Sequence, residues 1–213
     1  MKNFILNILS SIGKILITFL ENIGKITLFL FTSFFWCFKP PIYFKQLYLQ
    51  ILDIGFYSLP VVGLTTFFSG MVLALQTFSG FENLNSESTI ARIVLTSILR
   101  ELGPVLAGLM VAGRVGAKMA AEIATMKVTN QIDALETLAT RPIQYLIVPR
   151  LIAAILCVPF LVLVGNIIGI FGGFIVATIK LDFSASIYIV STFEYLKFID
   201  VMQGMVKALV FGI

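Results

Sequence analysis

Two adjacent opposite charges interrupt a long apolar stretch of this chain. Arg100 and Glu101 stand in the sequence Leu99-Arg-Glu-Leu-Gly-Pro104, and only twelve uncharged residues separate Glu101 from the next charge, Arg114. A helix needs about 20 residues to cross a hydrocarbon core of roughly 30 Å, so a helix that crosses here carries the pair well inside the membrane. A charge at that depth costs at least ~2.5–3.5 kcal/mol and normally faces protein or water. The pair therefore predicts either structural pairing with a neighbouring helix or a polar element of a transport pathway.

The composition indicates that the whole chain is a membrane protein. Of its 213 residues, 59% are hydrophobic and only 12% are charged, whereas soluble domains carry about 25% charged residues. The net charge is +4, but the basic residues cluster at the ends of apolar runs, which argues against nucleic-acid binding. We expect an all-α integral membrane protein.

The residue types present exclude several kinds of chemistry. The chain has no histidine, and Cys37 and Cys157 both stand in apolar runs, which excludes Ser-His-Asp and Cys-His catalysis and the usual zinc sites. The stretch that comes nearest to a phosphate loop, Gly113-Arg-Val-Gly-Ala-Lys118, lacks the Gly-Lys pair and the hydroxyl that such a loop needs. We expect no catalytic residue, metal site or cofactor in this chain. If ATP drives its work, a partner subunit binds and hydrolyses that ATP.

The amino-terminal region has the pattern of an interfacial helix. Between residues 3 and 25, polar side chains recur at steps of three and four, and apolar side chains occupy the other side. Such an amphipathic helix suits the membrane interface. The apolar run 26–38 has 13 residues and continues this region, which we place at 1–45.

Longer apolar runs predict about four membrane spans, at 54–78, 89–111, 151–179 and 201–213. Gly165, Gly169 and Gly173 recur every four residues in the third span, a pattern that permits close helix contact. The last run reaches only about 20 Å, at 1.5 Å per residue. We therefore expect the chain to be truncated at its carboxyl terminus, with a fifth span beyond residue 213.

The segment 114–150 is polar and predicted to be cytoplasmic. With the amino terminus inside, ten basic residues fall on inner segments and three on outer segments, in agreement with the positive-inside rule. A narrow apolar stripe runs through this segment beside acidic residues. Its candidate contacts with a partner protein are Glu122, Met126, Ile132, Leu135 and Glu136. A short amphipathic helix of this kind suits a partner's groove, and the alternative is a lid that packs on its own bundle.

Four sequence motifs together resemble the signature of the MlaE-type permease family. They are Leu99-Arg-Glu-Leu-Gly-Pro-Val, Ala112-Gly-Arg-Val-Gly-Ala, Ala121-Glu-Ile-Ala-Thr-Met-Lys-Val-Thr and Gln131-Ile-Asp-Ala-Leu-Glu. Gly70-Met-Val-Leu-Ala-Leu-Gln76 and Pro149-Arg150 are similar to the family too. Members are the membrane subunits of ABC transporters that move phospholipid in the Gram-negative envelope.

The resemblance implies a single permease domain over 1–213 that works as a homodimer in the inner membrane. It implies two cytoplasmic ATPase subunits, a periplasmic lipid-binding MCE-domain protein, and a coupling helix around 122–138 that enters the ATPase groove. Phospholipid would lie between the protomers, at positions that correspond here to Leu73, Gln76 and Phe81. Arg100, Glu101 and Lys207 correspond to the family's charged intramembrane positions.

Two other functions remain open from the residues alone. An intramembrane enzyme would use Glu101 as acid or base, with Asp200 as a carboxylate that approaches it in the fold. A membrane scaffold would transport nothing. Because adjacent residues on a helix point about 100° apart, Arg100 and Glu101 each need a separate counter-group, and we predict that Lys207 contacts Glu101.

Overall fold

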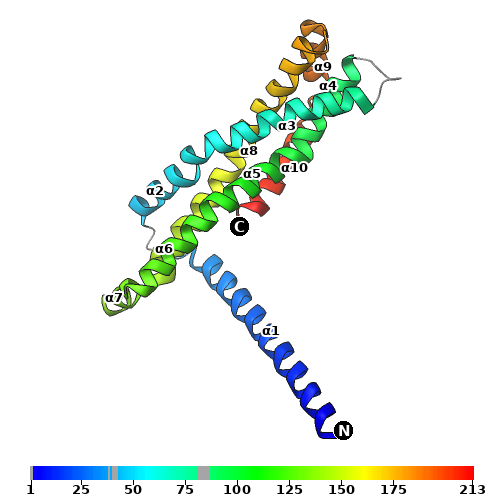
Figure 1. Cartoon of the computed structure of the whole chain (residues 1–213). Helices are drawn as coiled ribbons and strands as arrows, with labels where there is room; N and C mark the ends of the chain where they lie inside the picture. The colour runs from blue at the N-terminus through cyan, green and yellow to red at the C-terminus, as the bar shows by residue number, and fades with distance from the viewer. Residues whose placement is uncertain (1, 38, 40–42, 81–86) are drawn as a thin grey trace.

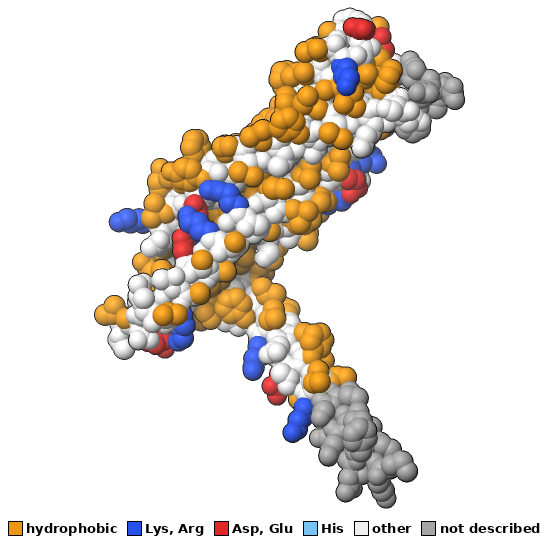
Figure 2. Space-filling view, in the orientation of Figure 1, with side chains coloured by type: hydrophobic (Ala, Val, Ile, Leu, Met, Phe, Trp, Pro, Cys, Tyr) orange, Lys and Arg blue, Asp and Glu red, His pale blue; other side chains and the backbone are white. Residues whose placement is uncertain are grey.

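The computed structural model describes residues 2–37, 39, 43–80 and 87–213, with side chains from residue 13 onward. Every regular element in these ranges is a helix, and most of them run along one elongated bundle (Figure 1). The surface of the bundle is largely apolar, and its charges gather in a few groups (Figure 2). The expected all-α membrane architecture is thereby confirmed.

The first helix, α1 (Lys2–Cys37), projects away from the bundle and meets it only near its carboxyl end (Figure 1). The predicted amphipathic segment and the apolar run after it form one uninterrupted helix of 36 residues. Its part from Gly13 to Cys37 is long and apolar enough to cross a membrane. The interfacial placement of residues 3–25 stays a prediction.

Two helices, α3 (Leu59–Gly80) and α8 (Val148–Ile179), form the centre of the bundle and pack along most of their length. Glycines allow the close approach: a side chain at Gly70 would collide with the carbonyl of Gly169, and Gly165 faces Thr66. The predicted small-residue face of the third span is therefore confirmed as a helix contact. Before α3, the short helix α2 (Phe44–Ile54) packs on α8, and a 3-10 turn, η1 (Phe56–Ser58), joins α2 to α3.

A second long helical path runs from Glu87 to Val128. It comprises α4 (Glu87–Ser97), the π-helix η3 (Ile98–Leu102), α5 (Gly103–Val111), the π-helix η4 (Ala112–Gly116) and α6 (Ala117–Val128). The predicted span 89–111 therefore continues without a break into the polar segment.

The remaining elements complete both ends of the bundle. After α6 come α7 (Gln131–Thr137) and the π-helix η5 (Ile143–Ile147), which leads into α8. After α8, a turn with Asp182 at φ 54° leads to α9 (Ala185–Tyr195), which packs beside α4. The final helix, α10 (Phe198–Phe211), packs against α5 and α8.

Four helical paths in the described residues have the length and composition of membrane spans: Gly13–Cys37, Phe44–Gly80, Glu87–Val128 and Ile143–Ile179. Three of them contain the predicted spans 54–78, 89–111 and 151–179. The predicted span 201–213 falls on α10, a helix of only 14 residues.

Candidate functional site

Four charged side chains join η3 to α10, and we call them the charged seam: Arg100, Glu101, Asp200 and Lys207. Arg100 donates from Nε and Nη2 to Oδ1 of Asp200, at 2.8 and 2.6 Å. Lys207 donates from Nζ to Oε1 of Glu101 at 2.6 Å. The predicted Glu101–Lys207 contact is therefore present, and Arg100 has the separate counter-group that its position on the helix requires.

Proline chemistry explains why α10 docks at this point. Pro104 has no N–H, so the carbonyl of Arg100 loses the donor that an ordinary helix would provide. Lys207 Nζ donates to this carbonyl at 2.9 Å. One turn earlier on α10, Gly204 lies so close to the carbonyl of Leu99 that any side chain there would collide with it. The π-helix and Pro104 thus leave carbonyls on the surface of the long helix, and α10 covers them.

The two ion pairs differ in their burial. Asp200 is only 2% exposed, while the side chains of Arg100, Glu101 and Lys207 are 45%, 66% and 40% exposed. Arg100 therefore neutralises a buried carboxylate, whereas the Glu101–Lys207 pair lies on an accessible face of the helices. A pair at such a face can open and close without unfolding the core.

The seam also bears on the enzyme hypothesis. That hypothesis needed Asp200 near Glu101 as a second carboxylate. The structure instead pairs Asp200 with Arg100, whose Nε and Nη2 both donate to Oδ1 of Asp200. From the sequence, Asp200 is predicted only as a neighbour of Glu101. Its place in the first turn of the last apolar helix, about two turns before Lys207, was the signal for its role.

The predicted lipid-lining positions lie at the end of α3 away from α2. Leu73 is half-buried and packs beside a buried cluster that includes Ala74, Ile90 and Val94. Gln76 is exposed. Phe81 lies outside the described residues. Their role in lipid binding stays a prediction.

A second group of charges ties α6 to the bundle. Glu122 accepts a hydrogen bond from Arg150 of α8 at 2.6 Å. Lys118 donates to Asp53 at the end of α2, at 2.7 Å. Arg114 donates to the hydroxyl of Ser58 at 2.7 Å. Glu122, predicted as a candidate contact with a partner protein, is therefore paired within its own chain, a contact that no local pattern in the sequence signals.

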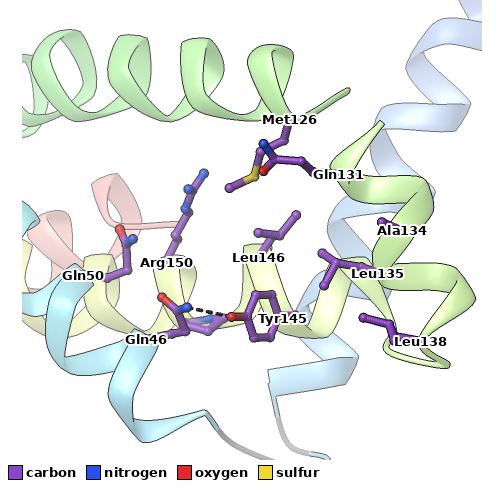
Figure 3. A pocket seen from close by; sticks show the side chains of 11 residues that line it. Gln46, Gln50, Met126, Gln131, Ala134, Leu135, Leu138, Tyr145, Leu146 and Arg150 are labelled. Carbon is purple, nitrogen blue, oxygen red and sulfur yellow. Dashed lines mark hydrogen bonds between the residues drawn. The ribbon is translucent and has the colours of Figure 1, made fainter. Parts of the chain in front are cut away.

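The coupling segment is two helices, so the prediction of one helix around 122–138 is wrong. A turn at Thr129-Asn130 separates α6 from α7, and Asn130 has a left-handed backbone with φ 56°. Met126 and Leu135 face a cavity between these helices and the bundle (Figure 3). Ile132 is half-buried and Glu136 is exposed. Part of the predicted stripe thus packs on the chain's own bundle, while Val128 and Leu138 are 83% and 74% exposed.

The helical paths and the paired charges between them define an all-α, multi-pass membrane protein. Comparison with known proteins assigns it more closely. The family described as "Permease MlaE" matches residues 47–213, and the chain belongs to this family.

Several curated relatives agree with this assignment. A probable ABC transporter permease protein of Rickettsia felis is 57% identical over 208 residues, which cover 98% of this chain and 80% of the relative. The intermembrane phospholipid transport system permease protein MlaE of Haemophilus influenzae is 35% identical, with the same shares covered. A probable ABC transporter permease protein of Synechocystis is 38% identical over 77% of this chain and 62% of the relative.

Proposed function

We propose that this chain is the membrane-spanning permease subunit of an ABC transporter that moves phospholipid. The similarity to an intermembrane phospholipid transport permease over 98% of the chain carries the proposal. The chain itself would catalyse no reaction and hold no cofactor; a cytoplasmic ATPase subunit would bind and hydrolyse ATP. The permease would act as a homodimer in the inner membrane and exchange lipid with a periplasmic MCE-domain protein.

The charged seam supports a transport role. An accessible ion pair inside a long apolar helix needs a covering surface or water, because charge facing lipid is costly. A second protomer over this face would supply that cover, and a lipid cavity between protomers would border the Glu101–Lys207 pair. The half-buried Leu73 and exposed Gln76 of α3 would line the same cavity toward the periplasm.

The end of the molecule formed by α6 and α7 supports ATPase docking. These helices extend beyond the rest of the bundle (Figure 1) and expose Val128 and Leu138. Apolar side chains in a groove supply most of the energy of such contacts. Glu122, Met126, Ile132 and Leu135 would hold the two helices in shape from the inner side, and Glu136 would contact the partner from the outer side.

Copurification and lipid transfer test the proposal together. The permease is purified from native membranes with its associated ATPase, then reconstituted in vesicles that contain a fluorescent phospholipid. We expect ATP-dependent movement of the lipid. Val128→Asp should abolish copurification of the ATPase, and Thr129→Asp, which adds the same charge at the neighbouring position, should leave it intact. Lipid turnover without any ATPase would instead favour an enzyme, and no lipid movement with the ATPase bound would refute phospholipid transport.

A further inference from the structure

A cavity of about 330 Å³ lies between α2, the α6–α7 pair and the start of α8 (Figure 3). Its polar lining comes from Gln46 and Gln50 of α2, Gln131 of α7, Tyr145 of η5 and Arg150 of α8. Apolar side chains, among them Met126, Leu135 and Leu146, line the rest of the cavity wall (Figure 3). Arg150 is the only charged side chain among the described residues that line it, and Glu122 pairs with it at 2.6 Å.

Only one of the two terminal nitrogens of Arg150 has a hydrogen-bond partner among the described residues. The residue is 7% exposed, and its Nη2 donates to Glu122. Its Nη1 is buried and has no hydrogen-bond partner among the described residues. A buried donor that is left unpaired is costly, and the cost is greater when the group is charged. Because this Nη1 has almost no accessible surface, an anionic group in the cavity would remove that cost by drawing the guanidinium away from Glu122 toward itself.

A second donor lies across the cavity from Arg150. Tyr145 accepts a hydrogen bond from Gln46 Nε2 at 2.9 Å. Its hydroxyl oxygen is thereby held in place while its own proton remains available to a ligand. The amide groups of Gln50 and Gln131 extend this polar lining on either side. These hydroxyl and amide donors suit a ligand with phosphate oxygens better than they suit an apolar side chain.

The surroundings resemble the headgroup layer of a membrane. The ring of Tyr145 packs edge-on against Tyr43 at 5.0 Å, and Arg141 lies over the ring of Trp36 at 4.3 Å. Tyrosine and tryptophan favour the membrane–water interface, and basic residues there attract anionic lipids. On the same helix α2, the apolar side chains of Phe44 and Leu49 are exposed. Acyl chains could lie along them.

We propose that this cavity binds the phosphate-bearing headgroup of an anionic phospholipid from the leaflet at the α6–α7 end of the molecule. Its volume is near the lower limit of ligand pockets, so it holds a headgroup and glycerol while the acyl chains stay in the membrane. The site lies at the opposite end of α3 from Leu73 and Gln76. Arg150 of α8 also pairs with Glu122 of α6. A bound headgroup would compete with Glu122 for Arg150 and so weaken the contact between these two helices.

The test measures lipid binding to the purified full chain by native mass spectrometry. The titrated probes are dioleoyl phosphatidylglycerol, dioleoyl phosphatidylcholine and soluble glycerol 3-phosphate. We expect phosphatidylglycerol to bind at least about tenfold more tightly than phosphatidylcholine, and Arg150→Gln to weaken phosphatidylglycerol binding by about tenfold or more. Lys127→Gln removes one charge from the same helix pair outside the cavity and should change binding less than twofold.

A cavity-filling variant keeps the proposal testable if Arg150→Gln fails to fold. Ala134→Trp fills the cavity, removes no charge or hydrogen bond, and should weaken phosphatidylglycerol binding as strongly. Normal binding by a folded Ala134→Trp variant would overturn the proposal, as would equal losses in Arg150→Gln and Lys127→Gln. Equally tight binding of glycerol 3-phosphate would assign the site to a soluble phosphate compound. Loss of ATPase copurification in Ala134→Trp with unchanged lipid binding would assign it to the partner protein. None of these results depends on which lipid the permease transports.

Discussion

Removing Arg100 tests whether the charged seam is structural at its buried end. Asp200 is 2% exposed, and among the described residues both of its side-chain hydrogen bonds come from Arg100. Arg100→Gln therefore leaves a buried carboxylate without its cation, a change that typically costs about 3–5 kcal/mol. Asp200→Asn keeps an oxygen that can accept from Arg100, whose side chain is 45% exposed, so the cost should be roughly 1 kcal/mol. We expect Arg100→Gln to be the more damaging substitution by about 2–4 kcal/mol, the difference between these costs.

Thermal unfolding in detergent, followed by circular dichroism, measures this difference. At about 2–4 °C per kcal/mol for a chain of this size, Arg100→Gln should lower the midpoint by about 6–20 °C. Asp200→Asn should lower it by a few degrees, and the double variant should recover most of the loss. Arg92→Gln, an exposed arginine on the same helical path, is the matched control and should shift the midpoint little. Equal shifts in the two single variants, or additive shifts in the double variant, would refute the reasoning.

Three further predictions concern the charged seam, the packing of α10 and the placement of α1. Glu101→Gln leaves Lys207 with only a backbone carbonyl, so phospholipid transport should fall, and adding Lys207→Met should restore part of it; a double variant with the summed defects would show no coupling. Gly204→Val pushes α10 away from η3 and should cost about 1–3 kcal/mol in thermal unfolding, whereas Gly113→Ala, which faces open space, should not. Lys14→Cys, without the two native cysteines, should react with a membrane-impermeant thiol reagent from the α6–α7 side, and protection from both sides would contradict an interfacial α1.

Several features of the fold follow from local pattern. Apolar runs of sufficient length predicted three of the spanning paths, and the four-residue glycine repeat predicted the close packing of α8. The contact between Glu101 and Lys207 was predictable because a charge inside a span needs a partner and few are available. These features are predictable because one large free-energy cost decides each of them. That cost is the exposure of unpaired backbone groups or of charge to hydrocarbon.

Other features depend on packing between distant segments. The separation of α6 from α7 depends on one residue with a left-handed backbone, Asn130. The sequence around Asn130 is also compatible with a continuous helix. The pairing of Glu122 with Arg150 joins residues on α6 and α8. A carboxylate beside an apolar stripe suits a partner's basic rim as well as an internal arginine, so pattern alone does not choose between them.

A proline lies beside the charged seam and another beside the cavity. Pro104 follows η3 by two residues, and Pro149 follows η5 by two residues. In each case the missing N–H removes one ordinary helical hydrogen bond, and a π-turn accommodates the change. The turn at η3 presents the carbonyls that Lys207 and Gly204 of α10 approach, and η5 carries Tyr145 into the cavity. Backbone freed inside a membrane must find another partner. A helix with such a proline therefore has a carbonyl without a hydrogen-bond donor. Lipid tails cannot supply that donor, so a side chain of another helix must do so. In the charged seam, Lys207 donates to the carbonyl of Arg100 and also pairs with the carboxylate of Glu101.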